Sequence, residues 1–197
     1  MQQDSARRSN RDRTEATRAE LIAAARRLFT QKSYAETSTP EIVTAAGVTR
    51  GALYHHFADK QALFAAVVEQ EAAAVAGEID RASPPSLGAR DALLAGSDAY
   101  LAAMRVPGRT RLLLLDGPAV LGRAEMDAID NRHGNRSLRE GLVAAMRARS
   151  MTKLPAEALT ALLAAAFDRA ALAIEAGAPA EEYRAVLTAL IDGLSRA

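Results

Sequence analysis

Four consecutive ring-bearing side chains stand in the stretch "TRGALYHHFADK", which spans residues 49–60. They are Tyr54, His55, His56 and Phe57, in a chain of 197 residues that has only 4 Tyr, 4 Phe, 3 His and no Trp. A tyrosine hydroxyl and an imidazole N–H can donate hydrogen bonds to phosphate oxygens. We expect Phe57 to belong to a small core, and a packing role for His56 stays open. The stretch therefore indicates a surface that binds phosphates.

Three further residues of this stretch suit contact with a nucleic acid. Arg50 can bridge two acceptors on a guanine edge or hold a phosphate. Gly51 costs about 1 kcal/mol in a helix interior, and close approach of DNA would explain its lack of a side chain. Lys60 begins the next expected helix, where its charge and the free backbone N–H groups suit a phosphate. The alternative is that these side chains form an ordinary solvated face.

Two short helices joined by a tight turn must position these side chains. In "TPEIVTAAGVTRGALYHHF", Thr39 is expected to cap a helix that has Pro40 at its first position. Gly47 is expected to end that helix, and Thr49 to cap the next one. This spacing is typical of a helix-turn-helix motif, whose second helix enters the major groove of DNA.

The rest of the chain also has the pattern of helices. An apolar stripe predicts a first helix at about 15–32, and Asp59 is expected to cap another at about 60–79. The segment "RASPPSLGARD" is the clearest break. Since no segment alternates like a strand, we expect an all-α fold, with a three-helix N-terminal unit joined to a larger C-terminal helical bundle. The later expected helices cover 87–105, 109–121, 124–150, 156–176 and 180–195.

Three stretches, "AARRLF", "TPEIVTAAGV" and "TRGALYHHFADKQALF", resemble the DNA-binding domain of the tetracycline-repressor-like (TetR) family of transcriptional regulators. The resemblance covers about residues 15–65, and Val43 departs from it where the family usually has alanine. It is consistent with a flexible basic arm (1–14), a helix-turn-helix DNA-binding domain (15–62) and an effector-binding and dimerisation domain (63–197). It implies that DNA is contacted by Thr39, Thr49, Arg50, Gly51, Ala52, Tyr54, His55 and Lys60.

The resemblance implies that the C-terminal bundle forms a homodimer. The last two expected helices place leucines among small alanines, which would let two helix pairs pack closely into a four-helix interface. The alternative is that these apolar stripes face the core of their own bundle. The candidate interface residues are Leu159, Leu162, Leu163, Ala166, Leu187, Leu190, Ile191 and Leu194.

The resemblance also implies an effector pocket in the bundle, and the segment 100–133 is the best candidate for its lining. Asp116 precedes Gly117-Pro118, where a helix break is expected, so Asp116 could line a cavity or cap a helix. Aromatic residues are scarce after Phe64, which argues against an aromatic cage for a cation. We expect an apolar or weakly acidic small molecule. The candidate contacts are Tyr100, Met104, Asp116, Val120, His133 and Phe167.

Charge and composition favour a DNA partner for the N-terminal part alone. Residues 1–60 hold ten Lys/Arg and seven Asp/Glu, whereas residues 61–197 hold fifteen and seventeen, so a weakly basic head joins a weakly acidic body. The chain has no cysteine, so disulfides and thiolate sites are excluded. No run of 18 apolar residues is present. We therefore expect a cytoplasmic bacterial protein without a membrane span.

Two other function classes are alternatives to a DNA-binding repressor. The stretch "LLLLDGPAVLGRA" is similar to a strand followed by a phosphate-binding loop, which would suit a nucleotide-binding enzyme. Arg123 and Ala124 replace the lysine and hydroxyl of that loop, and Pro118 removes an N–H. The other class is a helical scaffold that binds no DNA. We expect no enzyme activity, cofactor or metal site, and a repressor released from a pseudo-palindromic operator by its effector.

Overall fold

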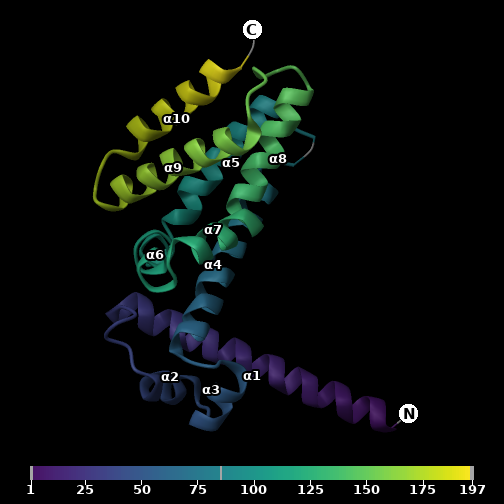
Figure 1. Cartoon of the computed structure of the whole chain (residues 1–197), viewed down its shortest axis with the longest axis vertical. Coiled ribbons are helices and arrows are strands. Elements are labelled where there is room, and N and C mark those ends of the chain that lie inside the picture. The colour runs from purple at the N-terminus through teal and green to yellow at the C-terminus, as the bar shows by residue number, and fades with distance from the viewer. Residues whose placement is uncertain (1, 85, 196–197) are drawn as a thin grey trace.

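The computed structural model describes residues 2–84 and 86–195, and within them the chain forms α-helices and one π-helix but no strand. The all-α expectation is confirmed. Figure 1 shows α1, α2 and α3 at one end of the molecule, with α4 leading from them into the larger helical part. The elements are α1 (Gln2–Lys32), α2 (Thr39–Ala46), α3 (Arg50–His56), α4 (Lys60–Ala82), α5 (Ala89–Met104), η1 (Arg111–Asp116), α6 (Gly117–Leu121), α7 (Arg123–Arg132), α8 (Gly134–Arg147), α9 (Ala156–Glu175) and α10 (Ala180–Leu194).

Helix α1 begins much earlier than its apolar stripe predicts. We expected residues 1–14 to form a flexible arm, but the helix starts at Gln2. Residues 2–14 contain no proline or glycine, so nothing in this segment breaks the helical hydrogen bonds. Its first turns project away from the other helices (Figure 1). The buried stripe of α1 is the expected one, with Leu21, Ala25 and Phe29 fully buried.

The cap of α2 is Ser38, not Thr39 as expected. The Ser38 hydroxyl accepts a hydrogen bond from the Glu41 backbone N–H, and the Glu41 carboxylate accepts one from the Ser38 N–H at 2.9 Å. This reciprocal capping box needs a glutamate three residues after the cap, which selects Ser38. Thr39 is instead the first residue of α2. The expected caps Thr49 and Asp59 are confirmed, since each side chain accepts a hydrogen bond from its helix.

Two of the long helices expected in the C-terminal part are divided. The expected helix 109–121 is a π-helix followed by α6, and the Gly117 N–H bonds to the Leu112 carbonyl oxygen, five residues back. Pro118 has no N–H, so the ladder changes register beside it. The expected helix 124–150 is broken at His133, whose backbone is not helical. Because η1 covers residues 111–116, this segment is helical and cannot be the strand that a phosphate-binding loop would require.

Replacing Gly117 with alanine is expected to destabilise the junction between η1 and α6. A Cβ atom there would lie 2.8 Å from the Leu112 carbonyl oxygen and 2.9 Å from Met126 Sδ. Overpacking of this kind costs about 1–3 kcal/mol, which urea unfolding followed by circular dichroism would measure. Gly134→Ala is the control, because a Cβ at Gly134 meets nothing within 4 Å. Equal stability of the two variants would contradict the prediction.

Two apolar clusters hold the fold together, and the first one crosses the border between the two parts of the molecule. It joins Phe29 of α1 and Phe64 of α4, whose rings pack edge to face, to Met104 of α5, Leu112 of η1 and Met126 of α7. The second cluster lies among α5, α8, α9 and α10. The half-buried Tyr100 side chain packs against both clusters. Because proteins pack densely, a shift near η1 would be felt at α1.

Candidate nucleic-acid interface and ligand cavity

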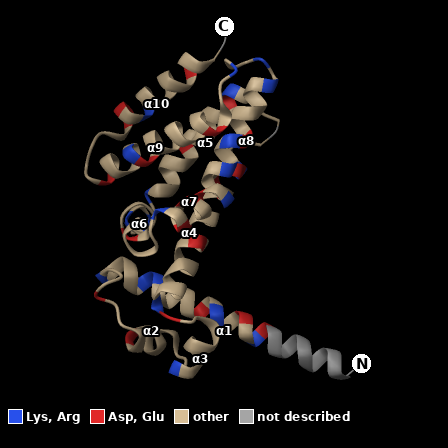
Figure 2. Cartoon of the chain, in the orientation of Figure 1, with Lys and Arg blue, Asp and Glu red and all other residues tan. Residues whose placement is uncertain are grey.

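Helix α3 presents hydrogen-bond donors on one face and core residues on the other. Arg50, Tyr54 and His55 are exposed, whereas Leu53 and Phe57 are buried. The Arg50 guanidinium lies 5.5 Å from the centre of the Tyr54 ring, so the two side chains stand together on the outer face. Figure 2 shows a basic segment, in blue, on α3 at the lower end of the molecule. This is the arrangement that a helix needs to read a DNA groove.

Gly51 stands on the same face, and nothing inside the protein requires it to be glycine. It is exposed, and an added Cβ would meet only Thr49 Oγ1, at an ordinary 3.8 Å. Packing within the chain therefore does not explain this residue. Thr49 is also exposed, but its hydroxyl already accepts the capping bond from the Ala52 N–H at 3.1 Å. Ala52 and Thr39 are half-buried.

The Lys60 side chain does not reach toward the face of α3. Its ammonium donates hydrogen bonds to the carbonyl oxygens of Tyr34, at 2.9 Å, and Thr37, at 3.0 Å, and lies 4.1 Å from the centre of the Tyr34 ring. These contacts tie α4 to the loop between α1 and α2. We expected Lys60 to contact phosphate, whereas its geometry favours a bracing role. Only its backbone N–H, at the start of α4, keeps an arrangement suited to phosphate.

His56 and the basic N-terminal segment complete this region. The His56 ring is half-buried and lies against the Phe57 ring, which fits the packing role that the sequence left open. Burial, followed by the charges of His55 and Arg18, lowers the pKa of His56 and favours its neutral form. The Arg18 guanidinium stands 5.2 Å from the centre of the Phe57 ring. The earlier arginines of the expected basic arm, Arg7, Arg8 and Arg11, have side chains outside the described part.

A buried ion-pair network joins the helix-turn-helix part to the C-terminal part. Glu71 of α4 accepts hydrogen bonds from Arg26 of α1 at 2.7 Å and from Arg109, just before η1, at 2.9 Å. Arg109 also donates to Glu78 at 3.0 Å and to the Ala103 carbonyl oxygen at 2.8 Å. Burial alone would raise the pKa of Glu71, but the hydrogen bonds from the two arginines outweigh burial and lower it.

Two direct contacts run alongside this network. A Cβ on Gly108 would collide with Thr30 of α1, so the turn before η1 lies directly on that helix. The Gln61 side chain of α4 donates a hydrogen bond to the Val120 carbonyl oxygen of α6 at 2.9 Å. The turn before η1 thus contacts α1, and α6, which follows η1, contacts α4. Helices α1 and α4 are the two that flank α2 and α3 in the chain.

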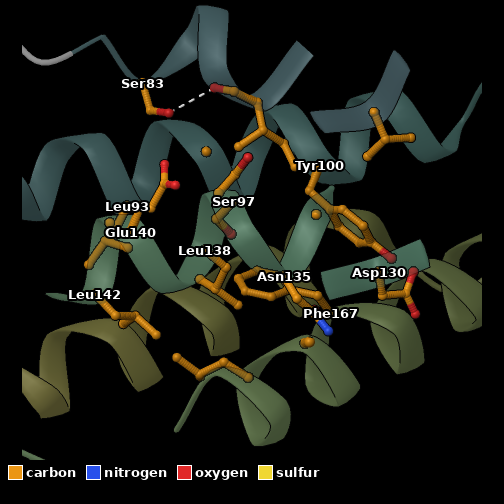
Figure 3. Close-up of a pocket in the computed structure, with 18 of the residues that line it drawn as sticks. Ser83, Leu93, Ser97, Tyr100, Asp130, Asn135, Leu138, Glu140, Leu142 and Phe167 are labelled. Carbon is orange, nitrogen blue, oxygen red and sulfur yellow. Dashed lines mark hydrogen bonds between the residues drawn. The ribbon is translucent and has the colours of Figure 1, made fainter. Parts of the chain in front are cut away.

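A cavity of about 700 Å³ opens among α4, α5, α7, α8 and α9, with residues of η1 at one side. Figure 3 shows Leu93, Leu138, Leu142 and Phe167 around its apolar part. Of the expected effector contacts, Tyr100, Met104 and Phe167 line this cavity. Its volume is in the range of small-molecule sites.

The other three expected contacts lie away from the cavity. Asp116 faces Arg111, with 3.3 Å between its Oδ2 and the arginine Nε. It makes no capping hydrogen bond to α6. Val120 packs against the first apolar cluster. The His133 ring lies against Glu69 of α4, with Nε2 2.5 Å from Oε1. All three belong to the segment 100–133, which the sequence indicates as the pocket lining, but this segment is divided at Gly117-Pro118 and at His133, whose backbone is not helical.

Sequence reasoning missed two carboxylates in the cavity, Asp130 and Asp168. The Tyr100 hydroxyl donates a hydrogen bond to Asp168 Oδ1 at 2.6 Å. Burial raises the pKa of Asp168, and burial together with the charges of Asp168 and Asp127 raises the pKa of Asp130 to about 6. A signal was present, since Asp168 interrupts the apolar run "LLAAAFDRAALA". A weakly acidic ligand would meet like charge here, so this lining does not favour the expected acidic alternative.

The expected dimer residues divide between the core of the bundle and its outer surface. Leu163, Leu187 and Ile191 are buried in the second cluster, and Leu159, Ala166 and Leu194 are half-buried against it. Leu162 is 72% exposed and Leu190 is 45% exposed. An apolar stripe therefore remains on the outer side of α9 and α10, made of Leu162, Val186 and Leu190 together with the exposed alanines Ala158, Ala185 and Ala189.

No helix in the described residues is long and apolar enough to cross a membrane. Two family models match the chain. Residues 21–67 match the model of bacterial regulatory proteins of the tetR family, and residues 90–196 match the tetracyclin repressor-like C-terminal domain.

Curated relatives match about a third of the chain. The transcriptional regulator AcrR of Shigella flexneri is 45% identical over 62 residues, which is 32% of this chain and 29% of that protein. The transcriptional repressor AcnR of Corynebacterium efficiens is 37% identical over 65 residues, or 33% of this chain and 35% of that protein. The chain thus matches about a third of the length of these relatives.

Solved structures match nearly the whole chain. A TetR-family transcriptional regulator from Pectobacterium atrosepticum has a TM-score of 0.75 and 33% identity, covering 95% of this chain and 98% of that one. The reduced form of NemR from E. coli has a TM-score of 0.72 and 22% identity, covering 91% and 97%. The second likeness concerns the fold alone.

Proposed function

Because this chain belongs to the TetR family of bacterial regulatory proteins, we propose that it is a dimeric, sequence-specific DNA-binding repressor released by a small molecule. The proposed role is binding rather than catalysis, and its place of action is the cytoplasm, where bacterial DNA lies. The observation that carries the proposal is the outer face of α3. There Arg50 and Tyr54 stand exposed beside Gly51, which has no structural reason inside the chain to be glycine.

The proposed DNA contacts come from both ends of the helix-turn-helix. Thr49, Arg50, Gly51, Ala52 and His55 face the groove, while Thr39 and Tyr54 hold phosphates and fix the position of α3. Lys60 contributes its backbone N–H and its bracing contacts rather than its charge.

The outer stripe of α9 and α10 is the proposed dimer interface. Leu162, Val186 and Leu190 would be covered there by the same helices of a second subunit, and the surrounding alanines allow close approach. Two subunits related by a twofold axis would place their α3 helices about 34–36 Å apart, in successive major grooves. The operator is then a pseudo-palindrome.

Release is proposed to follow a path from the cavity to α1. Met104 and Leu113 line the cavity, and the same segment leads through Arg109 to Glu71 and Arg26. A ligand that shifts η1 would move the attachment of α1 and change the separation of the two α3 helices. By linkage, DNA must weaken ligand binding by the same factor by which the ligand weakens DNA binding.

Fluorescence anisotropy with labelled duplexes tests the DNA-binding proposal. The purified full chain is titrated into DNA fragments flanking its own coding region and into a scrambled duplex, at two salt concentrations. We expect one fragment to bind at least 10³-fold more tightly than the scrambled duplex, with affinity that falls steeply as salt rises. Equal and weak binding to all fragments of a wider genomic library would refute it.

Gly51→Ala separates a functional role of this glycine from a structural one. Alanine is favoured over glycine in helices by about 1 kcal/mol, and the new methyl group meets no atom closer than 3.8 Å. We expect unchanged or slightly raised thermal stability together with operator binding weakened by about tenfold or more. A variant that binds DNA like the parent protein would show that the groove does not approach this position.

A further inference from the structure

The charged residues that line the cavity fall into two groups. Those at the outer side have ion-pair partners: Arg136 lies 2.9 Å from Asp80 and 3.1 Å from Glu140, and Arg123 lies 3.5 Å from Asp127. The two more buried carboxylates, Asp130 and Asp168, have no such partner in the described chain. The lining as a whole holds five carboxylates and one arginine, namely Asp80, Asp127, Asp130, Glu140, Asp168 and Arg123.

No cationic side chain of the described chain forms an ion pair with Asp130. Its carboxylate makes no hydrogen bond or ion pair there, and Asp130 lies in the last turn of α7, where the helix dipole disfavours a negative charge. Burial, then the charges of Asp168 and Asp127, raises its pKa to about 6, despite the opposing influence of Arg123 and His133. Asp130 is therefore still mostly ionised at pH 7.5, at a cost to the folded state.

Asp168 is held in place without being neutralised. Its Oδ1 accepts the hydrogen bond from the Tyr100 hydroxyl, which carries no positive charge. Burial, followed by the charge of Asp168, the hydrogen bond to it and the charge of Asp130, raises the pKa of Tyr100. All three residues line the cavity, and the hydrogen bond joins Tyr100 directly to Asp168. Figure 3 shows Tyr100 and Asp130 at one end of the cavity and Leu93 and Leu142 at the opposite end.

We propose that the cavity binds an amphipathic organic cation, with a protonated amine between Asp130 and Asp168 and an apolar chain against Leu93, Leu138 and Leu142. This inference rests on the proposed function and names the chemical class of its effector. Two carboxylates replace the aromatic cage that the sequence lacks. An ammonium group has three N–H donors, enough to bond both carboxylates at once.

Other ligand classes fit this end of the cavity less well. An anion would be repelled by the two half-buried carboxylates, and this repulsion strengthens as water is excluded from the site. A neutral alcohol could donate one hydrogen bond but would leave the charges of Asp130 and Asp168 uncompensated. A cation would supply the ion-pair partner that Asp130 and Asp168 lack, and so offset the cost of withdrawing their charges from water.

Isothermal titration calorimetry with three probes of equal chain length tests the proposal. Decylamine, decan-1-ol and decanoate are titrated into the full chain at pH 7.5, below their aggregation limits. We expect decylamine to bind at least tenfold more tightly than decan-1-ol, and decanoate to bind most weakly. Tighter binding of decanoate or decan-1-ol, or no binding of any probe, would overturn the inference.

Two variants test whether Asp130 and Asp168 cause the preference for decylamine over decan-1-ol. In Asp130→Asn and Asp168→Asn the advantage of decylamine over decan-1-ol should fall to threefold or less, with decan-1-ol affinity unchanged. Asp98→Asn is the matched control, because this aspartate of α5 pairs with Arg184 and does not line the cavity. Asp130→Asn should also raise the melting temperature at pH 7.5, since it removes an uncompensated charge. Retention of the full preference in both cavity variants would overturn the assignment.

The pH dependence gives an independent readout. The groups that act on Asp130 are Asp127, Arg123, His133, Asp168 and Tyr100. As the pH falls from 8 to 5 Asp130 takes up a proton, so decylamine affinity should drop about tenfold while decan-1-ol affinity stays constant. A pH-independent decylamine affinity would contradict the role of Asp130. DNA binding is measured separately by anisotropy, so failure of this inference with intact operator binding leaves the proposed function standing.

Discussion

Replacing Arg50 with alanine is expected to weaken operator binding by between about 30-fold and about 2 × 10⁴-fold. A bidentate contact from arginine to a guanine contributes about 1–3 kcal/mol, and a dimer loses two such contacts, hence about 2–6 kcal/mol. Arg50 is exposed, and its one described contact is with the Tyr54 ring, so the fold should be unaffected. Anisotropy on the operator, with melting curves of both proteins, measures the two effects separately.

Two further variants make the Arg50 result specific. Arg50→Lys keeps the positive charge but loses the planar pair of donors, so it distinguishes guanine recognition from a phosphate contact. If Arg50 reads a base, the lysine variant should lose affinity for the operator and keep its weak affinity for scrambled DNA. Arg139→Ala removes an exposed arginine on α8 that pairs with Glu157, far from α3, and should bind DNA normally. Equal loss on both duplexes in Arg50→Lys would contradict base recognition.

Replacing Glu71 with alanine is expected to lower the free energy of unfolding by about 3–5 kcal/mol. The Glu71 side chain is 8% exposed and that of Arg109 is 7% exposed, so the variant leaves a buried arginine without its main partner. Denaturant unfolding followed by circular dichroism measures the loss. Asp98→Asn breaks an exposed pair, 56% and 40% exposed, and should cost at most about 1 kcal/mol. Similar losses in the two variants would contradict a buried network.

The pH dependence of the Glu71 effect has a defined sign. Because the folded protein lowers the pKa of Glu71 below its ordinary value of 4.5, the ionised side chain stabilises the fold above pH 4.5. This stabilisation is lost as the pH falls through the lower folded value. The stability difference between the parent chain and Glu71→Ala should therefore be largest near neutral pH and shrink in acid. A difference that grows in acid would contradict this account.

The helix-turn-helix could be predicted closely from the sequence because its signals are local. Thr49 and Asp59 cap helices through their own side chains, and Gly47 ends α2 with the left-handed backbone that glycine favours. The one misplaced cap, Thr39 for Ser38, is also a local matter, settled by Glu41. The outward position of Arg50 and the burial of Leu53 follow directly from helical periodicity.

The cavity could not be predicted in the same way because it is formed by contacts between distant helices. Asp130 and Tyr100 lie on different helices, and Asp168 comes from a third. His133 was expected to line the cavity, but the helix is interrupted at this residue, and its side chain contacts Glu69 instead. Lys60 shows the same limit, since its partners are carbonyl oxygens of a loop more than twenty residues away in the sequence.

Selection of binding sites from a random duplex library, followed by footprinting of the best sequence, tests the central claim most directly. The claim is that two copies of this chain read DNA with their α3 helices in successive major grooves. We predict enrichment of an inverted repeat whose half-sites are centred about one helical turn apart, or a whole number of turns, with protection on one face of the duplex. Enrichment of a single half-site, or of no sequence, would contradict a dimeric sequence-specific regulator.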